Sequence, residues 1–237
     1  VRDAGLEPVR TEAEGPVALI QGFNPKMGWE DLAEAAYTLA NPDVLWIATN
    51  TDQTIPKERG QAPGNGTLVA AVATASRRTP LVAGKPEAPI FHTAAKAVNS
   101  SRPVIVGDRL DTDILGANNA KMDGALVLTG VQTYQDVIEA VPNQRPTYIL
   151  RTLEDFFAPY PEIEVLYEGY EVTATGPTWQ ARVRGENLSL TGPEIEDAEA
   201  FAGSESEAEA WRVACAAWWA ANPEQGARPN IQGIPGA

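Results

Sequence analysis

The sequence has one cysteine, one histidine and no long hydrophobic run. A single cysteine, Cys215, cannot form a disulfide within the chain, and nothing in the cysteine usage points to secretion. The one histidine, His92, falls inside a predicted helix, so a histidine-dependent mechanism has little support. No apolar stretch approaches the roughly 20 residues that cross a bilayer. We therefore expect a cytoplasmic protein without a membrane span.

Basic residues are also scarce. The chain has 18 Lys and Arg against 32 Asp and Glu, a net charge of −14. Nucleic acids and anionic membranes are bound by clustered Lys and Arg, so both are disfavoured as partners. A phosphate substrate is still compatible with this net charge, because a lysine and a divalent cation at the binding site outweigh the repulsion from the protein's overall negative charge. Residues 151–237 carry 15 of the acidic residues and only 5 basic ones, which predicts a separate acidic unit.

Two carboxylates follow a predicted buried strand in the middle of the chain. The apolar run 103–106 stops at Gly107, and Asp108 and Asp113 come next, with Thr112 between them. Ligands of open α/β sheets bind outside the carboxyl ends of the strands, and one or two carboxylates suit Mg²⁺. The alternative is that Asp108 starts a turn and Asp113 caps the helix predicted over 114–122.

A cationic strand end precedes this pair. Leu81 and Val82 lead into Gly84-Lys85-Pro86, and a helix is predicted over 88–98. A lysine at the end of a buried strand is a point charge suited to a phosphate, although a single lysine is more often simply solvated. Together the two strand ends predict a combined phosphate and metal site.

These motifs resemble those of a known family. Gly84-Lys85-Pro86 followed by Gly107-Asp108 and Thr112-Asp113 is similar to the third and fourth motifs of haloacid dehalogenase (HAD)-like phosphatases. The segments 48–52 and 63–66 resemble the substrate loop and following turn in the cap of the class IIA subfamily, which includes sugar- and nitrophenyl-phosphatases. The resemblance covers about residues 1–150. It implies an α/β fold: an incomplete HAD-like doubly wound core with a C2-type α/β cap.

The chain divides into three expected parts, each with its own pattern of elements. Residues 1–79 are the partial cap, with strands over 16–23 and 44–49, helices over 29–39 and 66–75, and a polar loop over 53–62. Residues 80–157 form the second half of the core, with strands at 81–82, 103–106, 125–128 and 146–150. Residues 158–237 form an acidic α+β C-terminal domain, with strands over 165–170, 171–174, 179–183 and 188–190, a helix over 207–221 and an irregular tail. The tryptophan cluster of that helix is expected in a core or a domain interface.

The chain departs from the family pattern in one respect. The family's nucleophile lies in an Asp-x-Asp-Gly motif, and a Ser or Thr motif that binds phosphate precedes the cap; neither is found here. The only Asp-x-Asp is Asp111-Thr112-Asp113. We expect the chain to be the later part of a longer one, with the missing N-terminal segment of the same protein as its partner. The chain alone is then expected to be inactive.

The resemblance implies Mg²⁺-dependent hydrolysis of a small phosphorylated metabolite through an aspartyl-phosphate, with glycerol 3-phosphate as the best candidate. Phosphoglycolate, sugar phosphates and nitrophenyl phosphate are its rivals. The implied catalytic residues are Lys85 and Asp113, the metal ligands are Asp108 and Asp113, and the substrate-binding residues are Asn50, Asp52, Lys85, Arg109 and Thr112. For Asn50 and Asp52 the alternative is an Asx-type turn that stabilises the loop itself. For the whole chain the alternative is a non-catalytic metabolite- or protein-binding module. A second copy of the chain, in a homo-oligomer, is a further candidate partner.

Overall fold

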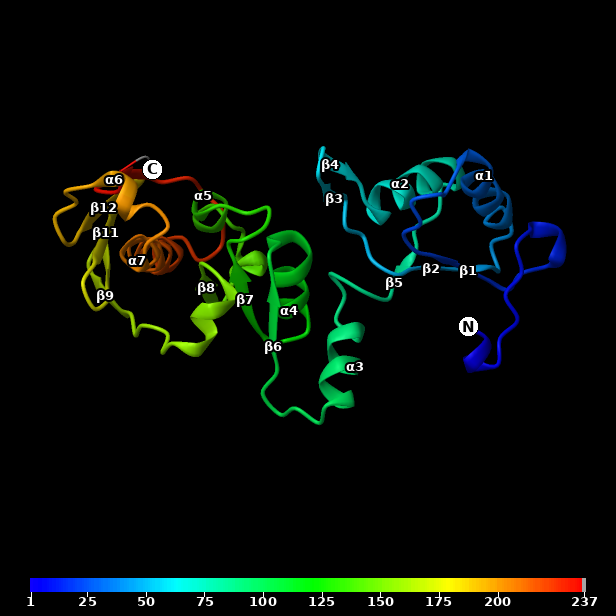
Figure 1. Cartoon of the computed structure of the whole chain (residues 1–237), viewed down its shortest axis with the longest axis horizontal. Helices are drawn as coiled ribbons and strands as arrows, with labels where there is room; N and C mark the ends of the chain where they lie inside the picture. The colour runs from blue at the N-terminus through cyan, green and yellow to red at the C-terminus, as the bar shows by residue number, and fades with distance from the viewer. Residues whose placement is uncertain (236–237) are drawn as a thin grey trace. The chain divides into compact units, whose positions relative to one another are not determined.

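A computed structural model describes residues 1–235, and the chain forms two compact units, Val1–Asn99 and Ser100–Ala237 (Figure 1). Both units combine helices with sheets, so the predicted α/β class is confirmed. No helix among residues 1–235 is both long and apolar enough to cross a membrane.

The first unit is built on a parallel sheet with strand order β1-β2-β5. Its elements are η1 (Arg2–Ala4), η2 (Glu12–Glu14), β1 (Ala18–Gln21), α1 (Trp29–Thr38), β2 (Leu45–Ala48), β3 (Thr54–Lys57), β4 (Gly60–Pro63), α2 (Asn65–Ser76), β5 (Leu81–Val82) and α3 (Pro89–Ala97). Trp46, Val69 and Val72 are buried where α1 and α2 pack on one face of the sheet. The predicted polar residues lie in the segments that follow the carboxyl ends of β2 and β5.

The first unit differs from the sequence prediction at two places. The segment 53–62, expected as a loop, contains the antiparallel hairpin β3–β4, whose turn ends at Gly60 with a positive φ of 119°. Strand β5, expected in the core half, pairs with β2 and places Leu81 beside Ile47. The pairing continues past the strand, because the Ala83 N–H donates to the Ala48 carbonyl at 2.9 Å.

The second unit begins with another parallel sheet, in the order β6-β7-β8. Its elements are β6 (Val104–Gly107), the π-helical turn η3 (Leu110–Ile114), α4 (Leu115–Asn119), β7 (Asp123–Val127), α5 (Tyr134–Ile138), η4 (Pro142–Gln144), β8 (Tyr148–Leu150) and η5 (Leu153–Phe157). The helix predicted over 114–122 ends early, since Lys121 takes a left-handed conformation with φ 58°.

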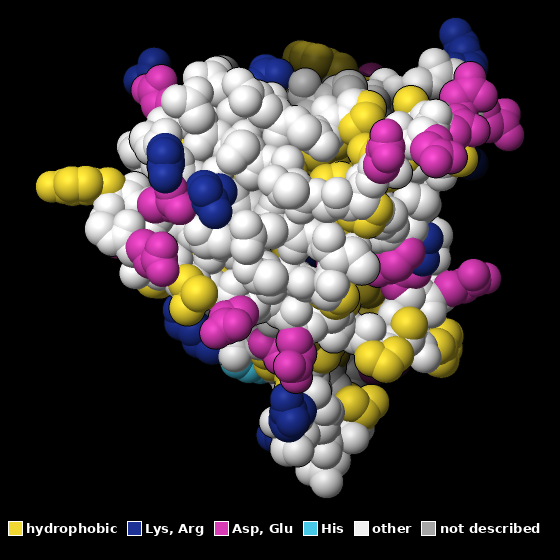
Figure 2. Space-filling model, turned by 90° about the vertical axis from the view of Figure 1, so that its left-hand side faces the viewer, with side chains coloured by type: hydrophobic (Ala, Val, Ile, Leu, Met, Phe, Trp, Pro, Cys, Tyr) yellow, Lys and Arg dark blue, Asp and Glu magenta, His cyan; other side chains and the backbone are white. Residues whose placement is uncertain are grey.

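The C-terminal part of this unit is a five-stranded sheet, in the order β13-β12-β11-β10-β9, packed on one long helix. Its elements are β9 (Glu164–Glu168), β10 (Glu171–Thr175), β11 (Gln180–Arg184), β12 (Asn187–Thr191), α6 (Ala198–Phe201), α7 (Glu205–Ala221) and β13 (Asn230–Gln232). The four predicted strands and the predicted long helix are confirmed. The tail was expected to be irregular, which is wrong for 230–232, because these residues pair in parallel with β12. Acidic side chains are spread over this side of the molecule and form no single patch (Figure 2).

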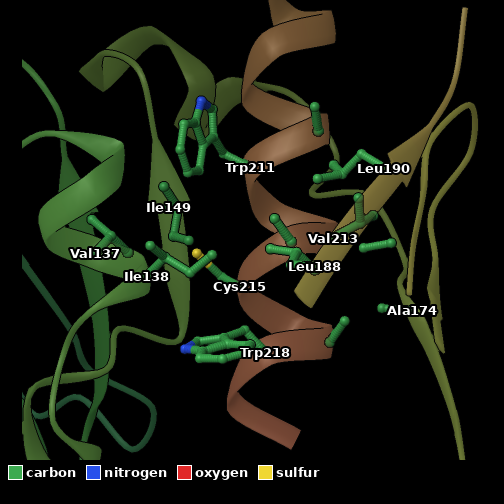
Figure 3. Packing of buried hydrophobic residues seen from close by; sticks show 14 of the residues in the cluster. Val137, Ile138, Ile149, Ala174, Leu188, Leu190, Trp211, Val213, Cys215 and Trp218 are labelled. Carbon is green, nitrogen blue, oxygen red and sulfur yellow. The ribbon is translucent and has the colours of Figure 1, made fainter. Parts of the chain in front are cut away.

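One hydrophobic core joins the two halves of the second unit. Val137, Ile138 and Ile149 lie on one side of α7, and Ala174, Leu188 and Leu190 lie on the other (Figure 3). Trp211, Cys215 and Trp218 extend from α7 toward the first of these groups, which confirms the expected position of the tryptophan cluster in a core. The C-terminal sheet is therefore not a loosely tethered domain, since its core continues into that of the β6-β7-β8 sheet.

Candidate metal and phosphate site

The two carboxylates predicted as metal ligands lie on one turn after β6. Asp113 is buried, and its Oδ2 accepts a hydrogen bond from the Arg109 N–H at 3.2 Å. The Asp113 N–H donates back to the Arg109 carbonyl at 3.1 Å. Gly107 allows this approach, because a Cβ on it would lie 2.3 Å from the Asp113 Cβ. The turn therefore fixes Asp113 against the end of β6, next to Asp108.

A loop after β7 supports Asp108. A Cβ on Gly130 would lie 1.9 Å from the Asp108 Oδ2, so only glycine leaves room for this carboxylate. The Leu110 N–H also points to this loop and donates to the Gln132 Oε1 at 3.3 Å. The ends of the neighbouring strands β6 and β7 thus meet at the carboxylates. Sequence reasoning missed Gly130 and Gln132, because no motif marks them.

Arg109 and Thr112 have different surroundings on the same turn. The Arg109 guanidinium forms a bidentate pair with Asp111, at 3.0 and 2.7 Å, so much of its charge is engaged locally. Thr112 is buried, and its hydroxyl has no hydrogen-bond partner among the described residues. A buried hydroxyl without a partner is costly. Of these two predicted substrate-binding groups, the Thr112 hydroxyl is the one with hydrogen-bonding capacity to spare.

The carboxylate pair fits Mg²⁺. Mg²⁺ binds hard oxygen ligands, accepts one or two carboxylates, and completes its shell with waters or phosphate oxygens. No cluster of three or more His, Cys, Asp or Glu with metal-binding potential is found within residues 1–235. A Mg²⁺ ion held by these two carboxylates would leave its other ligand positions to water, substrate or another segment.

Lys85 lies in the first unit, where the ends of β2 and β5 meet. Its ammonium is 3.5 Å from the Asp52 Oδ2, and both side chains are partly exposed. Its carbonyl accepts from the Thr51 N–H at 3.2 Å, and the peptide bond to Pro86 is cis. Gly84 lets the two segments touch, since a Cβ there would lie 1.9 Å from the Thr49 carbonyl oxygen. That Lys85 shares a site with the Asp108 turn stays a prediction.

The segment that holds Asn50 and Asp52 is a polar loop with spare acceptors. The Asn50 Oδ1 accepts from the Asp52 N–H at 3.2 Å, which is the Asx turn considered as the alternative for this loop. The Asn65 side chain donates to the Asn50 carbonyl at 2.8 Å and joins α2 to the loop. The Asp52 Oδ1 and the Asn65 Oδ1 are buried and have no hydrogen-bond partner among the described residues. Asn50 thus serves the turn, whereas Asp52 keeps an unused acceptor.

Comparison with known proteins places these features in a family context. A family profile described as HAD-hydrolase-like matches residues 82–156, which include Lys85 and the whole carboxylate turn. The D-glycerol 3-phosphate phosphatase of Mycobacterium tuberculosis is 42% identical over 203 residues, covering 84% of this chain and 54% of that protein. The glycerol-3-phosphate phosphatase of Gallus gallus is 43% identical over 124 residues, covering 51% of this chain and 40% of that protein.

Solved structures agree with the sequence relatives. A glycerol phosphate phosphatase from Mycobacterium tuberculosis in complex with magnesium has a TM-score of 0.77 and 34% identity, covering 98% of this chain and 64% of that chain. A p-nitrophenyl phosphatase from Archaeoglobus fulgidus has a TM-score of 0.57 and 31% identity, covering 65% of this chain and 60% of that chain. The chain thus spans between about two fifths and two thirds of the length of these relatives.

Proposed function

We propose that this chain belongs to the haloacid dehalogenase-like family, in its class IIA branch, and that the protein from which it comes is a Mg²⁺-dependent phosphomonoesterase. Its favoured substrate is glycerol 3-phosphate. The observation that carries the proposal is the turn after β6, which bears both Asp108 and Asp113, fixes Asp113 through the Arg109 N–H, and lies in the region that the family profile matches. We further propose that the protein is cytoplasmic, in keeping with its single, unpaired cysteine.

Each site residue has a role that follows from its chemistry. Asp108 would hold Mg²⁺ directly, and Asp113 would orient Asp108 or a metal-bound water from its fixed position. When bound, Mg²⁺ supplies charge neutralisation and alignment, the main contributions to phosphoryl transfer. Lys85 would neutralise the phosphoryl oxygens. The buried Thr112 hydroxyl would donate to a phosphate oxygen, which supplies the hydrogen bond that it lacks.

The nucleophile is proposed to come from another segment of the same protein. Within the 237 residues the only Asp-x-Asp belongs to the carboxylate turn. Strand β6 pairs only with β7 among the described residues, and its Val104 and Val106 are exposed. An apolar strand with one open edge is typical of a strand that has a further neighbour. We infer that a strand bearing the attacking aspartate pairs with β6, and that this chain alone does not turn over substrate.

Asp52 and Asn50 are proposed to act in substrate selection. The buried Asp52 Oδ1 without a partner would accept a hydrogen bond from a hydroxyl of the leaving group. Glycerol 3-phosphate offers two hydroxyls next to its phosphate, whereas nitrophenyl phosphate offers none. Asn50 would act indirectly, because its side chain holds the Asp52 backbone.

The test uses the intact protein with Mg²⁺ and four phosphomonoesters: glycerol 3-phosphate, phosphoglycolate, a sugar phosphate and nitrophenyl phosphate. We expect hydrolysis, with the highest kcat/KM for glycerol 3-phosphate, and loss of turnover in Asp108→Asn with an unchanged circular dichroism spectrum. If a folded intact protein hydrolyses none of the four, the enzyme proposal fails and a non-catalytic binding module becomes the better description.

A further inference from the structure

Helix α7 of the C-terminal domain contacts α5, the helix that directly follows the loop beside Asp108. The ring of Tyr134, the first residue of α5, stacks on the ring of Trp211 in α7, with centroids 5.5 Å apart and an angle of 3° between the planes. Thr133 caps α5, since its N–H donates to the Asp136 carboxylate at 2.7 Å and its hydroxyl accepts from the Asp136 N–H at 3.3 Å. The end of the loop is therefore fixed both by a helix cap and by an aromatic contact with the C-terminal domain.

The other side of the same loop carries the carboxylate turn. Gly130 lies against the Asp108 carboxylate, and the Gln132 Oε1 accepts from the Leu110 N–H. Gln132 is two residues before Tyr134. The backbone between the Trp211 contact and the Gln132 hydrogen bond to the carboxylate turn is therefore short. A displacement of this loop toward Asp108 would move the carboxylate, because there is no free space between it and Gly130.

The turn is also anchored in the core that α7 shares. Leu110 and Ile114, at the two ends of the π-helical turn, are buried in the cluster that contains Trp211 and Cys215. Two hydrogen bonds fasten α7 to the core sheet and to α5: the Arg212 Nε donates to the Ile149 carbonyl at 2.9 Å, and the Trp219 Nε1 donates to the Ile138 carbonyl at 3.2 Å. The apolar residues of the turn thus belong to the same hydrophobic core as α7.

We propose that the C-terminal domain is part of the metal site's support: α7 holds the β7–α5 loop against the carboxylate turn, and Gln132 is the positioning residue that links the two. The inference rests on the proposed function only in requiring that Asp108 binds Mg²⁺. Groups that orient metal ligands without touching the metal typically change metal affinity about 10- to 100-fold when they are removed. A domain added for partner binding alone would not need this contact.

The first experiment removes the Gln132 acceptor in the intact protein. Mg²⁺ affinity is measured by calorimetry, and the Mg²⁺ dependence of turnover is measured beside it. We expect Gln132→Ala to weaken Mg²⁺ binding about 10-fold, with little change in Tm. Gln132→Glu keeps an oxygen acceptor for the Leu110 N–H and should restore the affinity. Unchanged Mg²⁺ affinity in Gln132→Ala would overturn the role of Gln132.

The second experiment separates positioning from packing. Tyr134→Leu removes the stacking contact with Trp211, and the matched control, Phe201→Leu, removes another aromatic contact with a buried tryptophan, Trp179 at 5.9 Å. Both variants should lower Tm, but only Tyr134→Leu should weaken Mg²⁺ binding. Equal Mg²⁺ affinity in the two variants would show that α7 stabilises the fold by packing but does not position the metal site. Calorimetry measures Mg²⁺ binding independently of turnover. A wild-type protein that binds Mg²⁺ but hydrolyses no substrate would therefore contradict the proposed function without contradicting this inference.

Discussion

Gly130 lies so close to Asp108 that a side chain at this position would displace the carboxylate: its Cβ would be 1.9 Å from the Asp108 Oδ2. We therefore expect Gly130→Ala to lower turnover of the intact enzyme at least about 10-fold and to raise its Mg²⁺ requirement, because the metal ligand must move. The measurement is kcat as a function of Mg²⁺ concentration.

The control for this substitution is Gly28→Ala. Its added Cβ would approach only the Asp31 Oδ2, at 3.9 Å, which is an ordinary contact. The Gly28 variant should keep the Mg²⁺ dependence of the wild type. A Gly130→Ala enzyme with normal kinetics would mean that the Asp108 carboxylate does not act from its position against Gly130, and the support assigned to this loop would be wrong.

Asp52→Ala should change substrate preference rather than abolish activity. Asp52 has one oxygen near Lys85 and one buried oxygen without a partner. Loss of the ion pair affects every substrate through Lys85, whereas loss of the free acceptor affects only substrates that carry a hydroxyl. We expect the ratio of kcat/KM for glycerol 3-phosphate to that for nitrophenyl phosphate to fall about 10-fold, on the order of one hydrogen bond. A constant ratio would assign Asp52 to the support of Lys85 alone.

Much of the fold could be predicted because the sequence patterns are local. The strand ends at Gly84 and Gly107 follow short apolar runs, and the C-terminal strands alternate buried and exposed residues, as in Val172 and Ala174 of β10. The β3–β4 hairpin was missed because each strand has only four residues and includes a proline, and no apolar alternation marks either strand. Strand β13 has only three residues and gains its pairing from Leu188 of β12, which is remote in sequence.

The carboxylates of the site could be predicted, but their supports could not. Asp108 and Asp113 stand out because they follow a buried strand. The contact of Gly130 with Asp108 and the hydrogen bond from Leu110 to Gln132 join segments about twenty residues apart, and nothing in the spacing of these residues marks them. For the same reason, the sequence does not predict that the core half and the C-terminal sheet share one hydrophobic core around α7.

Arg145 ties the end of α7 to the core, and its replacement should be destabilising. Its guanidinium donates to the carbonyls of Ala140, Asn222 and Gln225 at 3.2, 2.7 and 2.9 Å. It also lies 5.6 Å from the Trp219 ring centroid, and burial lowers the pKa of this group. A lysine cannot form this fan of hydrogen bonds. We expect Arg145→Lys to lose about 1–3 kcal/mol of unfolding free energy, measured by urea denaturation.

The comparison for Arg145 is Arg228→Lys. The Arg228 side chain is 71% exposed and forms one ion pair, with Glu139 at 3.4 Å. Exposed ion pairs contribute little, so this variant should stay within about 0.5 kcal/mol of the wild type. Equal effects of the two substitutions would show that the carbonyl contacts of Arg145 add nothing to the docking of α7.

Asp155 should make the unfolding free energy of the second unit depend on pH in the acidic range. Burial alone would raise the pKa of Asp155, but the hydrogen bonds from Arg151 outweigh it and lower the pKa below its usual value. A carboxyl with a lowered folded-state pKa contributes its full stabilisation above the unfolded pKa of about 3.9, and loses it as the pH falls through the lower folded pKa. The unfolding free energies of wild type and Asp155→Asn should therefore differ by a constant amount above about pH 5 and converge below about pH 4. A difference that does not change with pH would place the effect of Asp155 in packing rather than charge.

Cys215 should report on the opening of α7. Its side chain is fully buried in the core beside α5, and burial raises the pKa of its thiol, so the reactive thiolate is scarce in the folded state. Because it is the only cysteine of these 237 residues, labelling of this chain reads a single site. We expect a disulfide-exchange reagent to leave the folded chain unlabelled at about pH 8 and to label it fully in concentrated guanidinium chloride.

The labelling rate at low denaturant should follow the global unfolding equilibrium, since Cys215 packs between the two halves of the second unit and reaches solvent only when they separate. Labelling that is fast in the absence of denaturant would mean that α7 opens locally, and a helix that opens so readily could not hold the carboxylate turn in place.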